Sequence, residues 1–359
     1  MNHPLHSSAH VVLRTDASNA IGFGHLRRCL AIADFVARAG GKPVFALGVF
    51  DDSARDSVEA AGWDCLELDD GTLFDATTLP GSSLVICDMS HPAAVEDVEK
   101  LPGYIAELQG NGCRVVLIDA PLAMCLAAKQ PLGVDLLVIP YLDGELQQVQ
   151  PGPHATAAGL PFAIVDSDYS DAAATGRDIA DNANRILVTA GGSDPTGATA
   201  LCLKALHAIT DADLTIRVVV GPAFDQKTRT EIQALAATNR HDTTLLDAPA
   251  GLLADMLWCD LALSASGVTK YELACAGTPA LLFSIDSDLD AMNSSFRQLG
   301  TCKDMGQVAD LSPDILASAV RQIRSDRSRR QTMSEAGRDA VDGRGCARMF
   351  EALEAARAA

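Results

Sequence analysis

The sequence predicts an α/β protein made of two halves, each built around a parallel sheet. Short aliphatic runs of strand length alternate with segments of helical periodicity along all 359 residues. Two of these runs, Ser83–Cys87 and Arg114–Ile118, are almost continuously aliphatic, as expected for strands that are buried on both faces. Aromatic residues make up only 4% of the chain, so we expect cores packed with Ala, Leu and Val.

The predicted strands fall into two series. The first series is His10–Leu13, Pro43–Leu47, Ser83–Cys87, Arg114–Ile118 and Leu136–Ile139, with helices at about 25–39 and 53–61. Residues 147–181 then lose periodicity and gain Pro, Gly, Asp and Ala, which is typical of a connection between domains. The second series is Arg185–Thr189, Leu214–Val220, Leu261–Ser264 and Thr278–Phe283, with helices at about 199–209, 312–325 and 327–341. We therefore expect two Rossmann-like domains that face a central cleft, with ligands at the carboxyl ends of the strands.

Composition excludes several classes of partner. The formal net charge of −19 argues against nucleic acid, because phosphate binding needs basic residues. No apolar run is long enough to span a membrane, and the polar first ten residues lack the apolar core of a signal peptide. The ten cysteines are scattered, with no CxxC pair and no Cys/His cluster of metal-ligand spacing. We expect a cytoplasmic protein without metal or other cofactor, which is a monomer or a weak homo-oligomer.

A first candidate site follows the first predicted strand. It is formed by the residues Arg14, Asp16, Gly22, Gly24, His25 and Arg28. The glycines let a ligand approach the backbone, and the helix that begins near His25 supplies oriented N–H donors. A histidine kept neutral by the helix dipole could accept a proton at this point. The same residues also fit a structural turn in which His25 caps the helix or bonds to Asp16.

Two further loops precede helices in the second half. The first reads Thr189-Ala-Gly191-Gly192-Ser193-Asp194-Pro195, and its paired glycines suit a diphosphate. It also fits an ordinary turn with Asp194 as the N-cap and Pro195 as the first helical residue.

The second of these loops reads Ser264-Ala-Ser266-Gly267-Val268-Thr269, with Glu272 about one turn into the helix that follows. Glu272 could bind a sugar hydroxyl, or it could be a first-turn acid stabilised by the helix dipole. Neither a Walker motif nor GxGxxG is present. Two phosphate-binding helix starts in one half indicate a nucleoside diphosphate.

These motifs together resemble a known family. The pattern R-x-D-A-S-x-x-I-G-x-G-H-x-x-R-C-L-x-x-A, the GGSDP loop and the run S-A-S-G-V-T-K-Y-E-L-A-C-x-G-T-P-A-L-L-F are similar to the UDP-sugar hydrolases of pseudaminic acid biosynthesis. That family is grouped with the spore-coat polysaccharide glycosyltransferase-like proteins and has the GT-B fold of the MurG-type transferases. The resemblance covers roughly residues 11–345. We expect a sugar or acceptor domain at 1–165, a linker at 166–184, a UDP-binding domain at 185–345 and a closing helix at 346–359.

The resemblance implies an enzyme that hydrolyses UDP-2,4-diacetamido-2,4,6-trideoxy-β-L-altropyranose with inversion and without a metal. His25 matches the general base that activates water, and Asp16 and Arg28 match loop positions that shape its site. The substrate- or nucleotide-binding positions fall on Gly22, Gly24, Gly191, Gly192, Ser193, Ser266, Gly267, Val268, Thr269 and Glu272. Glu272 matches the residue that holds the ribose.

Three positions depart from the hydrolase pattern. An Asp-His-Tyr is replaced by Asp88-Met89-Ser90, an Asp-Asp by Asp119-Ala120 and an Asn-Gln by Asp288-Leu289. The tyrosine of the sugar site is therefore missing or supplied from elsewhere. Because all three departures lie where the sugar or acceptor should bind, two alternatives stay open. One is an inverting GT-B glycosyltransferase of surface glycans or flagellin, in which His25 deprotonates an acceptor hydroxyl. The other is a non-catalytic nucleotide-sugar binding protein.

Overall fold

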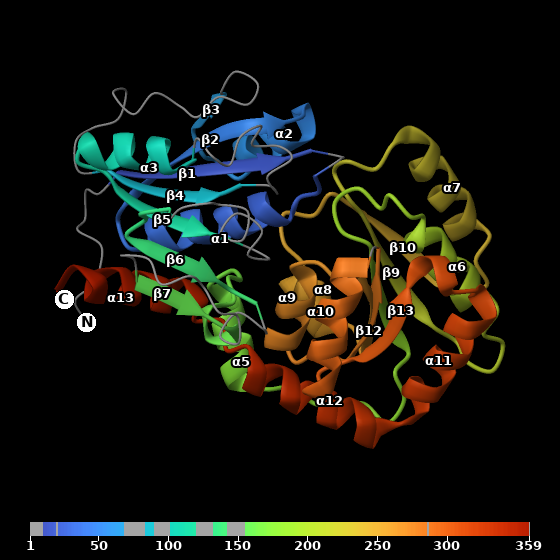
Figure 1. Ribbon diagram of the computed structural model, residues 1–359. Helices are drawn as coiled ribbons and strands as arrows, with labels where there is room; N and C mark the ends of the chain where they lie inside the picture. The colour runs from blue at the N-terminus through green and yellow to red at the C-terminus, as the bar shows by residue number, and fades with distance from the viewer. Residues whose placement is uncertain are drawn as a thin grey trace. The chain divides into compact units, whose positions relative to one another are not determined.

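The chain folds into two compact units (Figure 1). The computed structural model describes residues 10–18, 21–67, 83–89, 101–119, 132–141, 155–285 and 287–358. The first unit comprises Met1–Ser167 and Gly343–Ala359, and the second comprises Asp168–Asp342. Each unit is a parallel sheet flanked by helices, which confirms the two Rossmann-like domains expected from the sequence.

The first unit is built on a seven-stranded sheet of order β3-β2-β1-β4-β5-β6-β7. Its strands are β1 (His10–Ala17), β2 (Lys42–Phe50), β3 (Cys65–Glu67), β4 (Leu84–Asp88), β5 (Arg114–Ile118), β6 (Leu136–Ile139) and β7 (Ala155–Ala158). The chain leaves β1 toward β2 on one side and returns to β4 on the other. The loops after β1 and β4 therefore flank the switch point, where ligands bind in sheets of this type.

Both faces of this sheet are buried. Val11 of β1 belongs to one apolar cluster with α1, whereas Val12 belongs to the opposite cluster with α3, as the alternation of strand side chains requires. The α-helices that the structure describes in this unit are α1 (Gly24–Arg38), α2 (Asp52–Ala60), α3 (Leu101–Gly110) and α13 (Gly345–Ala358). The last helix returns to this unit from the end of the chain, and Phe350 stacks on Phe35 of α1 with ring centroids 5.4 Å apart.

The second unit has a six-stranded sheet of order β10-β9-β8-β11-β12-β13, with its switch point between β8 and β11. Its strands are β8 (Arg185–Thr189), β9 (Thr215–Val220), β10 (Asp242–Asp247), β11 (Leu261–Ala265), β12 (Ala280–Ser284) and β13 (Lys303–Gln307). Its helices are α5 (Asp168–Thr175), α6 (Ala198–His207), α7 (Gln226–Ala237), α8 (Leu253–Trp258), α9 (Thr269–Cys275), α10 (Ser287–Gln298), α11 (Pro313–Ser325) and α12 (Arg327–Ala340).

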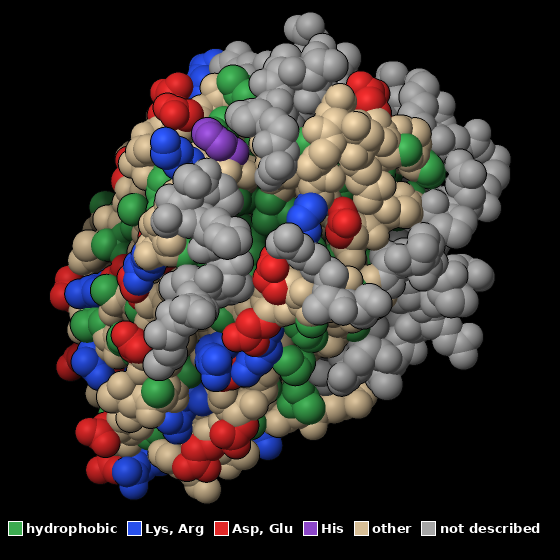
Figure 2. Space-filling model, turned by 90° about the vertical axis from the view of Figure 1, so that its left-hand side faces the viewer, with side chains coloured by type: hydrophobic (Ala, Val, Ile, Leu, Met, Phe, Trp, Pro, Cys, Tyr) green, Lys and Arg blue, Asp and Glu red, His purple; other side chains and the backbone are tan. Residues whose placement is uncertain are grey.

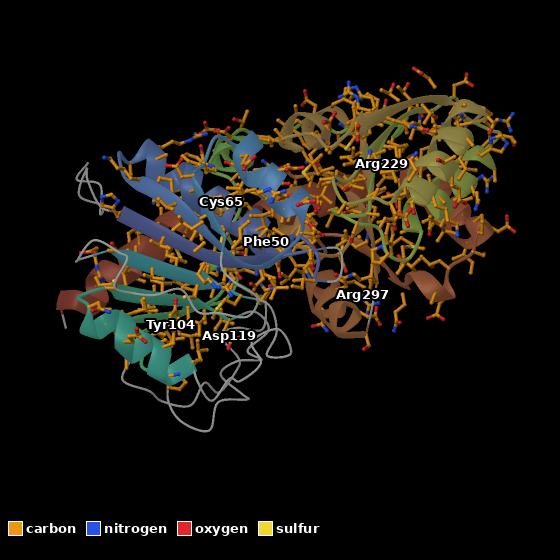
Figure 3. The ribbon with its side chains drawn as sticks, turned by 90° about the horizontal axis from the view of Figure 1, so that it is seen from above. Phe50, Cys65, Tyr104, Asp119, Arg229 and Arg297 are labelled. Carbon is orange, nitrogen blue, oxygen red and sulfur yellow. The ribbon has the colours of Figure 1, made fainter. Side chains whose placement is uncertain are left out.

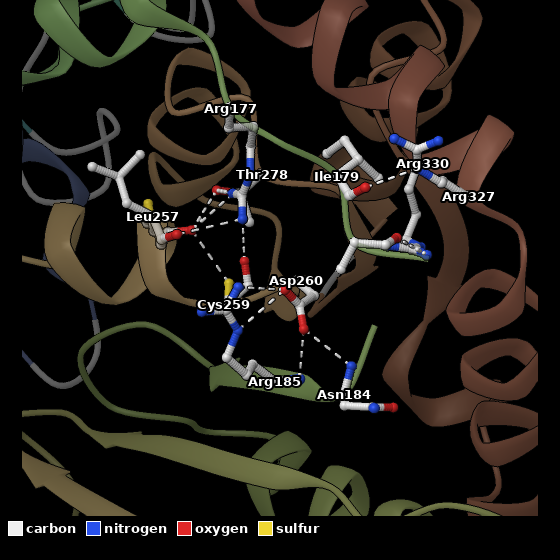
Figure 4. Close-up of polar contacts among 12 residues, drawn as sticks. Arg177, Ile179, Asn184, Arg185, Leu257, Cys259, Asp260, Thr278, Arg327 and Arg330 are labelled. Atoms are coloured by element: carbon white, nitrogen blue, oxygen red, sulfur yellow. Dashed lines mark hydrogen bonds and ion pairs between the residues drawn. The ribbon is translucent and has the colours of Figure 1, made fainter. Parts of the chain in front are cut away.

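The segment expected to be a linker, 166–184, is largely part of the second unit. It forms α5 and then runs along the unit, held by side chains (Figure 4). Nη1 of Arg177 donates to the carbonyl of Met256 at 3.0 Å and to the hydroxyl of Thr278 at 2.9 Å. The backbone N–H groups of Asn184 and Arg185 donate to Asp260 at 3.1 and 2.9 Å. The chain returns to the first unit between Asp342 and Gly343, before the boundary at 345 that the sequence suggested.

Arginines of α12 hold the same segment from the other side (Figure 4). Nε of Arg327 donates to the carbonyl of Ile179 at 2.8 Å. Arg330 is completely buried, and its Nη2 donates to the carbonyls of Ala180 and Asp181, each at 2.9 Å. Backbone carbonyls in this irregular stretch therefore take their donors from arginine rather than from a strand.

The described residues have free cysteines, helices that do not span a membrane and, on the face in Figure 2, mixed charges. No disulfide joins the cysteines that the structure describes. In the described parts of the chain, no helix has both the length and the apolar composition needed to cross a bilayer. Acidic and basic side chains are interspersed over the described part of the face in Figure 2, without a large patch of one sign.

We predict that Arg330→Met lowers the free energy of unfolding of the second unit by about 2–4 kcal/mol, because the carbonyls of Ala180, Asp181 and Ile323 lose a charged donor. The chain has two tryptophans, Trp63 in the first unit and Trp258 in the second. A Trp63→Phe background therefore leaves Trp258 fluorescence to report urea unfolding of the second unit. The exposed neighbour Arg329→Met is the control and should change stability by less than about 0.5 kcal/mol. Equal effects of the two substitutions would contradict the prediction.

Candidate functional site

The site in the first unit begins at the turn between β1 and α1. The N–H of Gly22 donates to the carbonyl of Ser18 at 2.7 Å, and Gly22 has φ +85°, which favours glycine. Gly24 is the first residue of α1, so His25 lies in its first turn. The N-cap position is taken by Phe23, which makes no side-chain cap bond. The alternative in which His25 caps this helix is therefore wrong.

His25 contacts a carboxylate that comes from another strand. Its Nδ1 lies 2.7 Å from Oδ1 of Asp88, the last residue of β4. Arg28, one turn after His25 on α1, forms a fork with the same carboxylate. Its Nε donates to Oδ2 at 2.7 Å and its Nη2 donates to Oδ1 at 2.8 Å. Three side chains are thus joined at the switch point of the first sheet.

The fork keeps a buried carboxylate ionised. Asp88 has no solvent exposure. Burial by itself would raise the pKa of Asp88, but the charge of Arg28 and the contact with His25 outweigh burial and hold that pKa below its ordinary value. Burial would lower the pKa of Arg28, and the attraction of Asp88 and Tyr141 outweighs this and raises it. Both members of the pair are charged at neutral pH.

The arrangement allows His25 to act as a general base. When Nδ1 carries the proton and donates to Asp88, Nε2 is left as the acceptor. Nη2 of Arg28 also lies 3.0 Å from Nδ1, and an N–H directed there would favour the other tautomer. The side chain of His25 is 16% exposed, so the ring is held by these groups and still reaches solvent. Which tautomer prevails decides whether Nε2 can accept a proton.

Two residues that the sequence analysis did not single out as site residues lie at the same sheet edge. Tyr141 follows β6, and its hydroxyl accepts from Nη1 of Arg28 at 3.1 Å. Asp119 follows β5 (Figure 3) and is 1% exposed. Asp88 was noted only as part of a motif that departs from the hydrolase pattern. Tyr141, Asp119 and Asp88 lie at or just after the carboxyl ends of neighbouring parallel strands, and this shared position is the signal in the sequence that could have found them.

Asp16 accepts hydrogen bonds from Arg14 and Val49. Its Oδ1 accepts from Nη1 of Arg14 at 2.6 Å and from the backbone N–H of Val49 at 2.8 Å. The contact with Val49 joins β1 to β2. The carboxylate that contacts His25 is Asp88, so the interpretation in which His25 bonds to Asp16 is replaced by this pair.

The two glycine loops of the second unit both lie at its switch point. The loop of Gly191, Gly192 and Ser193 follows β8, and the loop of Ser266, Gly267 and Val268 follows β11, the adjacent strand. Gly191 has φ +77°, and the carbonyl of Gly192 accepts from Ala223 at 3.0 Å. The two helix starts therefore lie at the same edge of one sheet. The interpretation in which both bind one diphosphate requires this arrangement.

Asp194 caps α6 although it lies four residues before the first residue of the helix. The helix begins at Ala198, with Gly197 at the N-cap, so Pro195 is not its first residue. The carboxylate of Asp194 reaches forward and accepts from the N–H groups of Ala198 at 2.8 Å and Thr199 at 3.0 Å. Burial raises the pKa of Asp194, and these hydrogen bonds offset part of that effect. Two first-turn donors of α6 are therefore occupied by the protein itself.

The start of α9 differs from that of α6. Thr269 is its first residue, and Val268 at the N-cap provides no side-chain cap. Ser266 is 1% exposed, and its hydroxyl has no hydrogen-bond partner among the described residues. Glu272 is 2% exposed, so it is not a solvated first-turn acid. The second loop thus combines uncapped N–H groups with a buried hydroxyl.

The remaining expectations concern metal and the three departures. The part of the chain that the structure describes contains no group of three His, Cys, Asp or Glu side chains that could hold a metal ion. Met89 is buried and belongs to the apolar cluster of α3. Asp288 and Leu289 lie in α10, where the structure does not describe their side chains, and Ala120 lies outside the described residues.

We predict that Asp88→Asn lowers the free energy of unfolding of the first unit by about 2–4 kcal/mol at pH 7, because it leaves Arg28 buried without its counter-charge. The folded pKa of Asp88 lies below the unfolded value of about 3.9, so the contribution of the pair is present above that pH and is lost as the pH falls through the folded pKa. The difference from the wild type should therefore shrink below about pH 4. Trp63 fluorescence in a Trp258→Phe background measures it, and the exposed Asp56→Asn is the control. A difference that persists unchanged at low pH would contradict the ionic origin.

Comparisons with known proteins give a distant relative and a clear fold. No family model matches the sequence. The chain is 29% identical over 218 residues to the spore coat polysaccharide biosynthesis protein SpsG of Bacillus subtilis strain 168. The match spans 60% of this chain and 60% of that protein.

Solved structures match nearly the whole chain. MurG of Acinetobacter baumannii gives a TM-score of 0.61 at 15% identity, over 97% of this chain and 99% of that one. The calicheamicin glycosyltransferase CalG4 gives 0.57 at 13% identity, over 100% and 99%. The UDP-GlcNAc 2-epimerase of Neisseria meningitidis, bound to UDP-GlcNAc, gives 0.55 at 14% identity, over 96% and 100%. The two parallel-sheet units of this chain therefore have the GT-B fold, which transferases and epimerases of sugars share.

Proposed function

We propose that the chain is an inverting GT-B glycosyltransferase that uses a nucleotide-activated sugar, with His25 as its general base. The observation that carries this proposal is the contact of His25 with the buried Asp88–Arg28 pair at the switch point of the first sheet. The two glycine loops at the switch point of the second sheet support it. The similarity to a protein of spore coat polysaccharide biosynthesis supports a glycan product.

In the proposed reaction, Nε2 of His25 takes the proton from the hydroxyl of an acceptor while that oxygen attacks the anomeric carbon. The bond between this carbon and the diphosphate oxygen breaks, and its electron pair leaves with the nucleoside diphosphate. Attack opposite the leaving group inverts the anomeric centre. Asp88 orients the ring and stabilises the imidazolium, in the manner of a carboxylate behind a catalytic histidine.

The second unit would bind the nucleotide. Backbone N–H groups of Gly191–Ser193 and of Ser266–Thr269 would take the diphosphate charge, so the proposal requires no metal. Glu272 would hold the ribose. We infer UDP as the nucleotide, supported by the resemblance of the motifs and by structural neighbours that carry UDP or UDP-GlcNAc. We place the reaction in the cytoplasm.

Transfer fits the site better than the hydrolysis of one particular UDP-sugar. The hydrolase pattern has a histidine where this chain has Met89, and Met89 is buried in the cluster of α3. The sugar site of that hydrolase is therefore not reproduced at this position. Water remains the competing acceptor, since the same base and diphosphate loops would serve it.

The test is to follow UDP and sugar by NMR after mixing the chain with UDP-GlcNAc or with UDP-2,4-diacetamido-2,4,6-trideoxy-β-L-altropyranose. Each donor is tested alone and with a set of soluble hexosaminides as acceptors. We expect UDP to be released only when an acceptor is present, together with a new glycosidic linkage of inverted configuration. Release of UDP and free sugar without an acceptor would show that the chain is a hydrolase and not a transferase. Absence of both UDP release and UDP binding would overturn the proposal.

We predict that His25→Gln lowers kcat by about 10²–10⁴-fold because the base is lost, while the Kd for UDP stays within about twofold. UDP-release kinetics and titration calorimetry measure the two effects. The control is His207→Gln, at the end of α6 in the second unit, which should leave both values unchanged. Normal turnover in the His25 variant would show that another group is the base.

We predict that Gly221→Ala weakens UDP binding by about tenfold or more. A Cβ at this position would lie 2.3 Å from the carbonyl oxygen of Gly192 and 2.6 Å from that of Gly191, so the diphosphate loop must move. Calorimetry with UDP measures the change. Gly103→Ala in α3 is the control, because its Cβ would meet no atom within 4 Å. Unchanged UDP affinity in the Gly221 variant would mean that this loop does not bind the nucleotide.

A further inference from the structure

Tyr141 contacts Arg28 but takes no part in the proposed mechanism. It comes from the end of β6, two strands from β4, and its hydroxyl accepts from Nη1 of Arg28 at 3.1 Å. Nε and Nη2 of the same guanidinium hold Asp88. The planar group is therefore held on two edges, by a carboxylate on one and by a phenol on the other.

The phenol is suited to this position because it is a neutral acceptor. Burial raises the pKa of Tyr141, so the group stays protonated at neutral pH although Arg28 lies beside it. A neutral oxygen fixes Nη1 without competing with Asp88 for the positive charge. The carboxylate of Asp119, after β5, also acts on the phenol and raises its pKa. The charged groups Asp88 and Arg28 contact His25 directly.

The position of the guanidinium decides which nitrogen of His25 carries the proton. Nη2 lies 2.8 Å from Oδ1 of Asp88 and 3.0 Å from Nδ1 of His25. Nη2 carries two N–H groups, and while the guanidinium is oriented so that one of them donates to Oδ1 and neither is aimed at Nδ1, the ring keeps its proton on Nδ1 and donates it to Asp88. A small rotation that directs the N–H to Nδ1 would place the ring proton on Nε2. That tautomer cannot accept a proton at Nε2.

We propose that Tyr141 is a positioning residue that sets the tautomer of His25 through Arg28. By holding Nη1, it keeps Nη2 directed to Asp88, and so keeps the proton of His25 on Nδ1. The inference rests on the proposed function, in which Nε2 is the base. In the hydrolase pattern the tyrosine of the site follows β4, whereas Tyr141 follows β6.

The first experiment needs no substrate. The chain is labelled with ¹⁵N-histidine, the signals of His25 are identified by their loss in His25→Gln, and the tautomer is determined from the nitrogen shifts. We expect the Nδ1–H form in the wild type and a shift toward Nε2–H in Tyr141→Phe. Tyr104→Phe, a buried tyrosine of α3 in the same unit, is the control and should leave the signals unchanged. A Tyr141→Phe spectrum identical to the wild type would overturn the proposal.

Kinetics separate positioning from a structural role. Tyr141→Phe should lower kcat by about tenfold with the KM for the nucleotide sugar within about twofold. In an Arg28→Lys background it should have no further effect on the tautomer, because both changes act on one guanidinium. An additive effect would contradict a path through Arg28. If the Phe variant does not fold, 3-fluorotyrosine at position 141, a weaker acceptor of nearly the same shape, must give the same direction of change. A wild-type chain with the expected tautomer but no turnover would refute the proposed function and not this inference.

Discussion

The ion pair of Arg28 and Asp88 is the contact on which the site of the first unit depends. Asp88 is fully buried at the end of β4, and it stays ionised there because the guanidinium compensates its charge. Arg28 belongs to α1, whose first turn carries His25. One carboxylate therefore ties a central strand to the helix that presents the base, and it contacts the base itself. The ring is oriented by the same bonds that hold α1 to the sheet.

The sequence predicts the parts of this site that depend on local pattern. Glycine spacing and strand periodicity located His25 and Arg28 after β1, and they placed the two glycine loops after strands that prove to be adjacent. The partner of His25 was not predictable in this way, because Asp88 lies 63 residues further along the chain. Asp16 was expected at the site because it ends the first predicted strand and matches a loop position of the family, and its carboxylate accepts from Arg14 and from the backbone of β2. Which strand ends meet is a property of strand order, which local pattern does not contain.

The parts of the fold that escaped prediction share a physical origin. The edge strands β10 and β13 are rich in polar residues, and β7 is short and Ala-rich, so they are strands because a neighbouring strand offers its backbone groups. The segment after α5 has no periodicity, and its carbonyls are satisfied by arginines that follow about 150 residues later. No local pattern separates buried Arg330 from its exposed neighbour Arg329. Long-range donors, rather than propensity, turn this supposed linker into part of the second unit.

The two helix starts of the second unit are not equivalent as anion sites. At α6, Asp194 occupies two first-turn N–H groups and brings a carboxylate to the helix start, which opposes a phosphate there. At α9, Val268 at the N-cap provides no side-chain cap and the hydroxyl of Ser266 is buried without a described partner, whereas the buried ammonium of Lys270 donates to Oδ1 of Asn293 at 3.5 Å. In a chain of net charge −19, a diphosphate gains little from long-range attraction. Its binding would therefore depend on these short-range donors, so the α9 loop should carry more of the diphosphate charge than the glycine loop before α6.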